Sequence, residues 1–149
     1  NTAKLSENVW KEAEKMLEQI QKYPQKEEYQ KLVEEDRINL YEREAEKGDD
    51  RKFLEETDRV FKENLRGDSA WKLYERKLVY LESKQPDISG EFERFLKKYP
   101  KVMDAYVEYS IYLCRNNKMT QAQRVYREGR KRTGMTSKRA EELRRKLGL

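Results

Sequence analysis

The chain has 149 residues, of which 42% are charged, and a net charge of +5. It has one cysteine, Cys114, and no histidine. These counts exclude a disulfide within the chain and a histidine-dependent catalytic pair, and they leave too few ligands for a zinc site. No apolar run approaches the ~20 residues that cross a bilayer, so we expect no membrane partner.

In chain order, turn-forming residues separate segments of helical length. The turns are predicted at residues 48–50, 67–69, 85–87, 99–100, 116–117 and 133–134. The segments between them hold roughly 12 to 20 residues, which is typical of helices joined by short connections. No segment alternates apolar and polar residues for long, so we expect no strand. The sequence therefore predicts an all-α fold.

Several residues at these turns are predicted to end or begin helices. Gly48 and Gly67 suit the left-handed conformation that terminates a helix. The predicted N-caps are Asp68, Asp87 and Thr120, and Thr120 with Gln123 fits a capping box. Each cap would satisfy backbone N–H groups that the first turn of a helix leaves without partners.

Apolar residues within the segments recur at helical spacing. One stripe runs through Trp71, Tyr74, Leu78 and Leu81, a second through Tyr106, Tyr109 and Leu113, and a third through Phe53, Thr57, Val60, Phe61 and Leu65. Each stripe is narrow because charged residues fill the other positions. Narrow stripes need neighbouring helices to bury them, so these residues are the predicted core.

The stripes repeat along the chain. A large apolar or aromatic pair at i and i+3 occurs at Ile38/Tyr41, Trp71/Tyr74 and Tyr106/Tyr109, at offsets of 33 and 35 residues. A second series of segments starts at Thr57, Ile88 and Ala122, at offsets of 31 and 34, and each has an aromatic residue in its fifth place. Two interleaved series with one period are typical of an α-solenoid, in which each repeat is a helical hairpin.

The repeated segments resemble a known family. "SAWKLYERKLVYLE" and "DAYVEYSIYL" are similar to the first helix, and "QAQRVYREG" to the second helix, of half-a-tetratricopeptide (HAT) repeats. Asp58, Ser89 and Gln123 stand where this family usually has an arginine in its second helix. The resemblance covers residues 36–132. Ordinary tetratricopeptide repeats remain an alternative, because the periods of the two families overlap.

The resemblance implies a right-handed superhelix of about three to four helical hairpins. It divides the chain into an N-terminal helix or degenerate repeat at residues 1–35, repeats at 36–132 and a basic capping helix at 133–149. It also implies a non-catalytic scaffold that binds other proteins in an RNA-processing assembly (splicing, 3′-end formation or ribosome biogenesis), and hence a nuclear location. Many members of the family form dimers, and a few bind RNA directly.

The C-terminal end of the chain is strongly basic. Residues 115–149 carry a net charge of +9, and the rest of the chain carries −4. On a helical wheel Arg124, Arg127 and Lys131 lie opposite the apolar face that contains Tyr126. Arg130 and Arg132 flank the two faces. The basic residues of the following segment that are expected to point outward are Lys138, Arg139, Arg144, Arg145 and Lys146. Three interpretations remain open: a solvated end face, contact with an acidic protein, and contact with nucleic-acid phosphates.

A tyrosine and two groups of carboxylates are further candidates. Tyr80 lies off the main stripe, so it is a partner-facing anchor, packs against the neighbouring repeat or stacks on a nucleic-acid base. The carboxylates at residues 34–36 and 55–56 alternate with Lys and Arg at i+3 and i+4. This spacing predicts surface ion pairs rather than acid–base chemistry. No glycine motif for nucleotides is present in the sequence.

We therefore predict no enzyme activity, no cofactor and no small-molecule substrate. The predicted function is a protein–protein interaction scaffold, and the alternative is a single-stranded RNA-binding module that uses the basic C-terminal end. A second copy of the chain is a further candidate partner. Because the sequence begins at Asn1 rather than Met, we expect the chain to be part of a longer protein.

Overall fold

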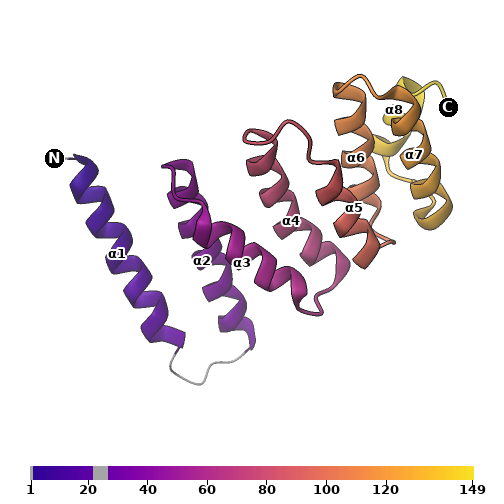
Figure 1. Ribbon diagram of the computed structural model, residues 1–149. Coiled ribbons are helices and arrows are strands. Elements are labelled where there is room, and N and C mark those ends of the chain that lie inside the picture. Colours follow the sequence, from indigo (N-terminus) through magenta and orange to yellow (C-terminus); the bar gives the residue numbers. More distant parts are fainter. Residues whose placement is uncertain (1, 22–26) are drawn as a thin grey trace. The chain divides into compact units, whose positions relative to one another are not determined.

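The protein is all-α in the residues that its computed structural model describes, which are 2–21 and 27–149. Those residues form eight helices and no strand (Figure 1). The helices are α1 (Thr2–Gln21), α2 (Glu27–Glu46), α3 (Arg51–Lys62), α4 (Gly67–Glu82), α5 (Ser89–Lys98), α6 (Met103–Arg115), α7 (Met119–Thr133) and α8 (Lys138–Lys146). The predicted all-helical fold is confirmed. Part of the predicted N-terminal segment 1–35, namely residues 1 and 22–26, lies outside the described residues.

The helices group into two compact units. The N-terminal unit comprises residues 1–62 with α1, α2 and α3, and the C-terminal unit comprises residues 63–149 with α4 to α8. Within the N-terminal unit α2 packs against both α1 and α3. An ion pair of 2.5 Å between Lys52 Nζ of α3 and Glu14 Oε1 of α1 adds a polar link.

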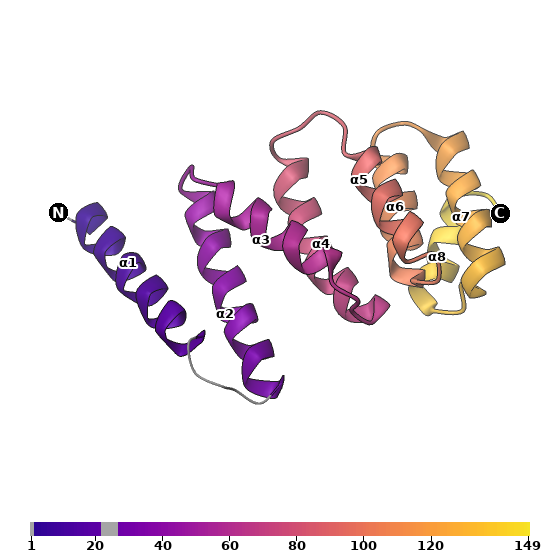
Figure 2. The same cartoon turned by 60° about the horizontal axis from the view of Figure 1, so that its bottom comes forward.

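Helix α6 makes the most packing contacts in the C-terminal unit. It packs against α5, α7 and α8, and α4 packs against α5 (Figure 2). Within this unit α4, α5, α6 and α7 thus each pack against the next helix in the chain, whereas α8 packs against α6. The expected pairs of first and second repeat helices correspond to α2 with α3, α4 with α5, and α6 with α7.

Aromatic side chains of α5 hold the C-terminal unit together. The ring of Phe95 lies 5.1 Å from that of Trp71 and 5.2 Å from that of Tyr74, both on α4. Phe92 stacks on Tyr109 of α6 with the ring centroids 4.8 Å apart. Each such pair stabilises by roughly 0.5–1.5 kcal/mol beyond area burial. The stripe residues Trp71, Tyr74, Leu78, Leu81, Tyr106, Tyr109 and Leu113 are all buried, so this predicted core is confirmed.

A buried ion pair also ties α4 to α5. Lys77 is only 6% exposed, and its Nζ lies 3.1 Å from Glu91 Oε2. The hydroxyl of Tyr74 donates to the same oxygen at 2.5 Å. Burial raises the pKa of Glu91, but the hydrogen bonds from Tyr74 and Lys77 outweigh burial, so the pKa lies below its ordinary value. The carboxylate thus partners a cation that would otherwise be buried alone.

Left-handed residues end several helices where turns were predicted. Gly134 follows α7 with φ of 82°, and its N–H donates to Arg130 O at 2.9 Å. Gly48 after α2 has φ of 115°, and Asn117 after α6 has φ of 59°. Only glycine adopts this backbone region at little cost, which explains its position at two of these three turns.

The prediction that Gly67 ends a helix is wrong. Helix α3 ends at Lys62, and Gly67 is the first residue of α4. A Cβ at this position would lie 2.7 Å from Val102 Cγ2. The close approach of the loop before α6, rather than a turn, therefore requires the glycine. Leu65, predicted on the stripe of the preceding helix, lies between helices and is half-buried.

The predicted capping box at Thr120 is also wrong. Helix α7 begins at Met119, so Thr120 lies inside its first turn, and the N-cap residue Lys118 makes no side-chain cap hydrogen bond. Gln123 instead donates from Nε2 to the carbonyl of Leu147 at 2.8 Å. This contact links α7 to the end of α8, so a long-range partner replaces the local one.

The two aspartates predicted as caps act away from the N-cap position. Asp87 Oδ1 accepts from Ser89 N at 2.9 Å, where Ile88 is the N-cap of α5. Asp68 Oδ1 accepts from Ser69 N at 3.0 Å, inside the first turn of α4. Both carboxylates still place negative charge at the N-terminal end of a helix, where the helix dipole favours it.

Candidate interaction site

The predicted basic residues of α7 lie on its exposed face. Arg124, Arg127 and Lys131 are exposed, whereas Tyr126 and Gly129 are buried against the rest of the unit. The prediction of their orientation is confirmed. None of these three cations forms an ion pair with another residue in the described part of the chain. Their charge is therefore open to solvent or to a partner.

The other predicted basic residues divide into paired and unpaired cations. Arg132 pairs with Glu128 at 2.6 Å, and Arg139 pairs with Glu108 of α6. Arg144 pairs with Glu141 at 2.9 Å and donates to the carbonyl of Leu149 at 2.6 Å. Arg130, Lys138, Arg145 and Lys146 are exposed and lack an ion pair within the described residues. The structure thus assigns three of the predicted cations to contacts within the protein.

Tyr80 belongs to a different helix from the predicted basic residues. It lies near the C-terminal end of α4 and is half-buried. Its carbonyl accepts a hydrogen bond of 2.7 Å from Ser83 Oγ, and Lys84 Nζ lies 5.9 Å from its ring centroid. Its apolar neighbour in the sequence, Val79, is exposed, with 67% of its surface accessible.

The C-terminal unit has a hollow of about 760 Å³ that was not predicted from the sequence. The first half of α4, the loop between α5 and α6, and the start of α6 line it. Its apolar lining residues are Trp71, Tyr99, Val102 and Met103, which are buried or half-buried. Its charged lining residues are Arg66, Asp68, Lys72, Glu75, Lys98, Lys101 and Asp104, and all of them are exposed. This hollow, called the α4–α6 hollow below, therefore has an apolar floor and a charged rim.

The cations on the rim differ in their partners. Arg66 Nε lies 3.6 Å from Asp68 Oδ1. Lys98 Nζ donates to the carbonyl of Glu63 at 3.0 Å and lies 5.5 Å from the ring centroid of Tyr99. Lys72 and Lys101 form no ion pair with any described residue. Two unneutralised cations, from two different elements, thus face the same hollow.

The carboxylate of Glu75 on the rim has an unusual environment. Burial raises its pKa, the charge of Glu108 raises it further, Arg139 lowers it, and Asp104 raises it. The net effect is a pKa above the ordinary value. Arg139, which pairs with Glu108, is the one cation that opposes this shift. Two carboxylates of α6 thus disfavour the ionised form of Glu75, and one arginine of α8 favours it.

A smaller hollow of about 390 Å³ lies in the N-terminal unit. Trp10 of α1 lines it, and Lys47 Nζ lies 4.8 Å from the Trp10 ring centroid. The ion pair between Lys52 and Glu14 closes another part of the wall. Cations of the protein itself already occupy this aromatic surface, so the larger hollow is the better candidate for a partner.

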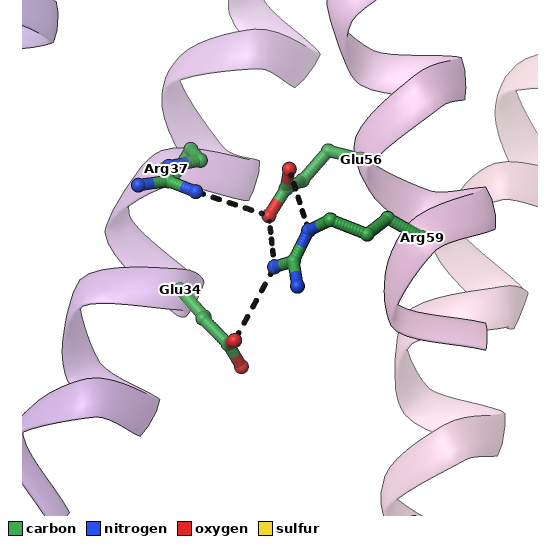
Figure 3. Close-up of polar contacts among 4 residues, drawn as sticks. All are labelled: Glu34, Arg37, Glu56 and Arg59. Atoms are coloured by element: carbon green, nitrogen blue, oxygen red, sulfur yellow. Dashed lines mark hydrogen bonds and ion pairs between the residues drawn. The ribbon is translucent and has the colours of Figure 1, made fainter. Parts of the chain in front are cut away.

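The carboxylates near residues 34 and 56 form an ion-pair network, as predicted. Arg59 contacts Glu56 at 2.7 Å and Glu34 at 3.3 Å, and Arg37 lies 3.6 Å from Glu56 (Figure 3). The surface location was wrong for Glu56, which is only 8% exposed. Two arginines compensate the cost of burying it, so the network joins α2 to α3 within the N-terminal unit.

The described residues contain no cluster of His, Cys, Asp and Glu placed to hold a metal ion. In the same part of the chain, no helix has both the length and the apolar character needed to cross a membrane. Comparison with protein-family models, with curated proteins and with solved structures found no match for this chain.

Proposed function

We propose that this chain is a non-catalytic scaffold segment that binds other proteins. Its architecture in this proposal is an α-solenoid, a right-handed superhelix of HAT-like hairpins. The observation that carries the proposal is the α4–α6 hollow, because an apolar floor with a charged rim is the usual composition of a protein-binding surface. The RNA-processing assembly and the nuclear location rest on the sequence resemblance alone.

Equivalent positions in successive helix pairs support the repeat architecture. Trp71 and Tyr106 occupy matching places in α4 and α6, and both are buried. Phe92 and Tyr126 match in α5 and α7, and both are buried as well. Residues that recur in sequence therefore recur in the core, as expected where each repeat buries its apolar face against its neighbours.

The first test is capture of partners from a nuclear extract with and without RNase. We expect the same proteins to remain bound after RNase treatment, because the hollow contacts protein directly. Mass spectrometry identifies them, and a chain with Lys72→Glu and Lys101→Glu serves as the comparison. Loss of all partners after RNase would contradict the scaffold proposal, since the chain would then be tethered through RNA.

The alternative function is binding of single-stranded RNA by the exposed face of α7. The observation that favours it is the row of Arg124, Arg127 and Lys131, which form no ion pair within the described residues. Residues at i, i+3 and i+7 lie along one side of a helix, so one strand could contact all three. Phosphate contacts of this kind are independent of base sequence.

The RNA alternative predicts a defined salt dependence. Three phosphate contacts on a single strand give a slope of about −2 in a plot of log affinity against log salt. The change Arg124→Glu with Lys131→Glu should flatten that slope to about −0.7 and weaken binding of a labelled oligouridylate by at least about tenfold. Fluorescence anisotropy measures both quantities. Equal binding by the wild type and this variant would exclude the face of α7 as the RNA site.

A further inference from the structure

The floor of the α4–α6 hollow is pre-formed. The ring of Trp71 packs edge-on against that of Phe95, with the centroids 5.1 Å apart and an interplanar angle of 63°. The ring of Tyr99 stacks on that of Phe95, also with the centroids 5.1 Å apart. The hydroxyl of Tyr106 donates to the carbonyl of Pro100 at 2.7 Å and holds the loop in place. A ligand would therefore meet an ordered apolar surface, and little conformational entropy would be lost on binding.

The size of the hollow suits an apolar side chain with its flanking backbone. Its volume of about 760 Å³ lies within the range of binding clefts. Val102 and Met103, beside Trp71, are half-buried and leave apolar surface accessible. An aromatic or large aliphatic side chain in this place would remove apolar area from water at roughly 25 cal/mol per Å².

The charges on the rim favour a negative occupant. Four cations line the hollow against three carboxylates, and Lys72 and Lys101 have no ion-pair partner in the described chain. Of the carboxylates, Asp68 lies beside Arg66 at 3.6 Å. The pKa of Glu75 is raised, so its negative form is less stable than that of an ordinary glutamate. Glu75 and Asp104, like Lys72 and Lys101, form no ion pair with a described residue, so the rim has an excess of one cation, and the raised pKa of Glu75 adds to this excess.

We infer that the α4–α6 hollow binds an acidic segment of a partner protein that places one apolar side chain on Val102 and Met103 and carboxylates against Lys72 and Lys101. This inference rests on the proposed scaffold function and names the chemistry of its partner. A basic segment would bring its cations toward Lys72, Lys98 and Lys101, and like charges at such distances oppose binding. A nucleic acid supplies phosphates but no aliphatic anchor for the floor, so it is an outcome of the test.

The experiment is selection from a displayed peptide library on the purified chain. Each peptide has about twelve residues, long enough to span the hollow in an extended conformation. One central position is aromatic or aliphatic, and the flanking positions are drawn at random from Asp, Glu, Lys, Arg, Ser and Gly. Counter-selection uses the variant with Lys72→Glu and Lys101→Glu, called the rim variant below. Its helix content is checked by circular dichroism.

A matched control separates the hollow from the exposed face of α7. The variant with Arg124→Glu and Lys131→Glu has the same change in net charge but leaves the hollow intact. We expect selected peptides to carry an excess of Asp and Glu and to bind the rim variant about tenfold more weakly than the wild type. The control variant should bind them within about twofold of the wild type. Replacing the central apolar residue by Ser should also weaken binding.

Three results would overturn the inference. The first is enrichment of basic or uncharged peptides, or no enrichment over the rim variant. The second is loss of binding in the α7 control variant alone. The third is displacement of the selected peptides by oligouridylate in the rim variant as well as in the wild type. If the peptide selection fails but the rim variant still captures RNase-resistant partners, the inference about the hollow is wrong and the scaffold proposal stands. If the wild type captures no RNase-resistant partner, the scaffold proposal itself is contradicted.

Discussion

Gly129→Ala is expected to destabilise the C-terminal unit by about 2 kcal/mol. A Cβ at residue 129 would lie 2.6 Å from Tyr106 Cβ of α6 and 2.5 Å from Met135 Cε. The methionine can move, but the Cβ of Tyr106 is fixed to the backbone of a neighbouring helix. Alanine would therefore push α7 away from α6, the helix against which it packs. Urea unfolding followed by circular dichroism measures the loss.

Gly90→Ala provides the matched control for this prediction. Gly90 lies in the first turn of α5, and a Cβ there would meet nothing within 4 Å. Alanine has a higher helix propensity than glycine by up to about 1 kcal/mol, so this change should leave stability unchanged or raise it. A gain in stability at residue 129 as well would show that helix propensity outweighs crowding and that α6 and α7 are not in close contact.

Glu91→Gln should cost the C-terminal unit about 2 kcal/mol in free energy of unfolding. Glutamine keeps an oxygen that can accept from Tyr74, but it removes the negative charge that partners buried Lys77. An uncompensated buried cation is strongly unfavourable. The cost is reduced because the side chain of Glu91 is 28% exposed, and solvent screens part of the interaction.

The stability lost in the Glu91→Gln variant should depend on pH. Burial raises the pKa of Glu91, and the opposing hydrogen bonds from Tyr74 and Lys77, with the charge of Arg94, lower it more. A lowered pKa means that the ionised carboxylate stabilises the fold above its ordinary pKa of 4.5 and that this contribution is lost as the pH falls below it. The difference in free energy of unfolding between the wild type and Glu91→Gln should therefore become smaller as the pH falls below 4.5.

Two controls make the Glu91 prediction specific. Adding Lys77→Met to Glu91→Gln should recover most of the lost stability, because an apolar side chain of similar length replaces the unpaired cation. Glu93→Gln keeps an oxygen that can accept from the Tyr109 hydroxyl, which lies 2.9 Å from Glu93 Oε1, and it leaves no buried cation without a partner, so it should cost less. A Glu91→Gln chain as stable as wild type at neutral pH would contradict the role assigned to the carboxylate.

Periodicity in the sequence predicted most of the core. The stripe through Trp71, Tyr74, Leu78 and Leu81 is buried because its spacing matches the turn of a helix. Lys77 and Glu56 were not predicted as buried. Lys77 falls seven residues after buried Ala70, and Glu56 three residues after buried Phe53, so both lie on apolar faces. This spacing could have indicated that both side chains are buried. A charged side chain is buried only where another helix supplies its partner, however, and the spacing within one helix does not show that partner.

The α4–α6 hollow could not be read from the sequence in the same way. Arg66, Tyr99 and Lys101 lie in connections between helices, where no period relates one residue to the next. They meet because α5 returns the chain toward the start of α4. The orientation of Arg124, Arg127 and Lys131 was predictable because it depends on one helix alone. The pairing of Arg139 with Glu108 was not, because it joins α8 to α6.

The two tryptophans of the chain fall one in each compact unit. Trp71 is 4% exposed in the core of the C-terminal unit, whereas Trp10 is half-buried beside Lys47 in the N-terminal unit. Each unit therefore carries its own intrinsic fluorophore in a distinct environment. Chains with Trp10→Phe or Trp71→Phe would emit from one unit only, so melting could be followed unit by unit. Coincident curves would mean that the units unfold cooperatively, and separate curves would assign a stability to each.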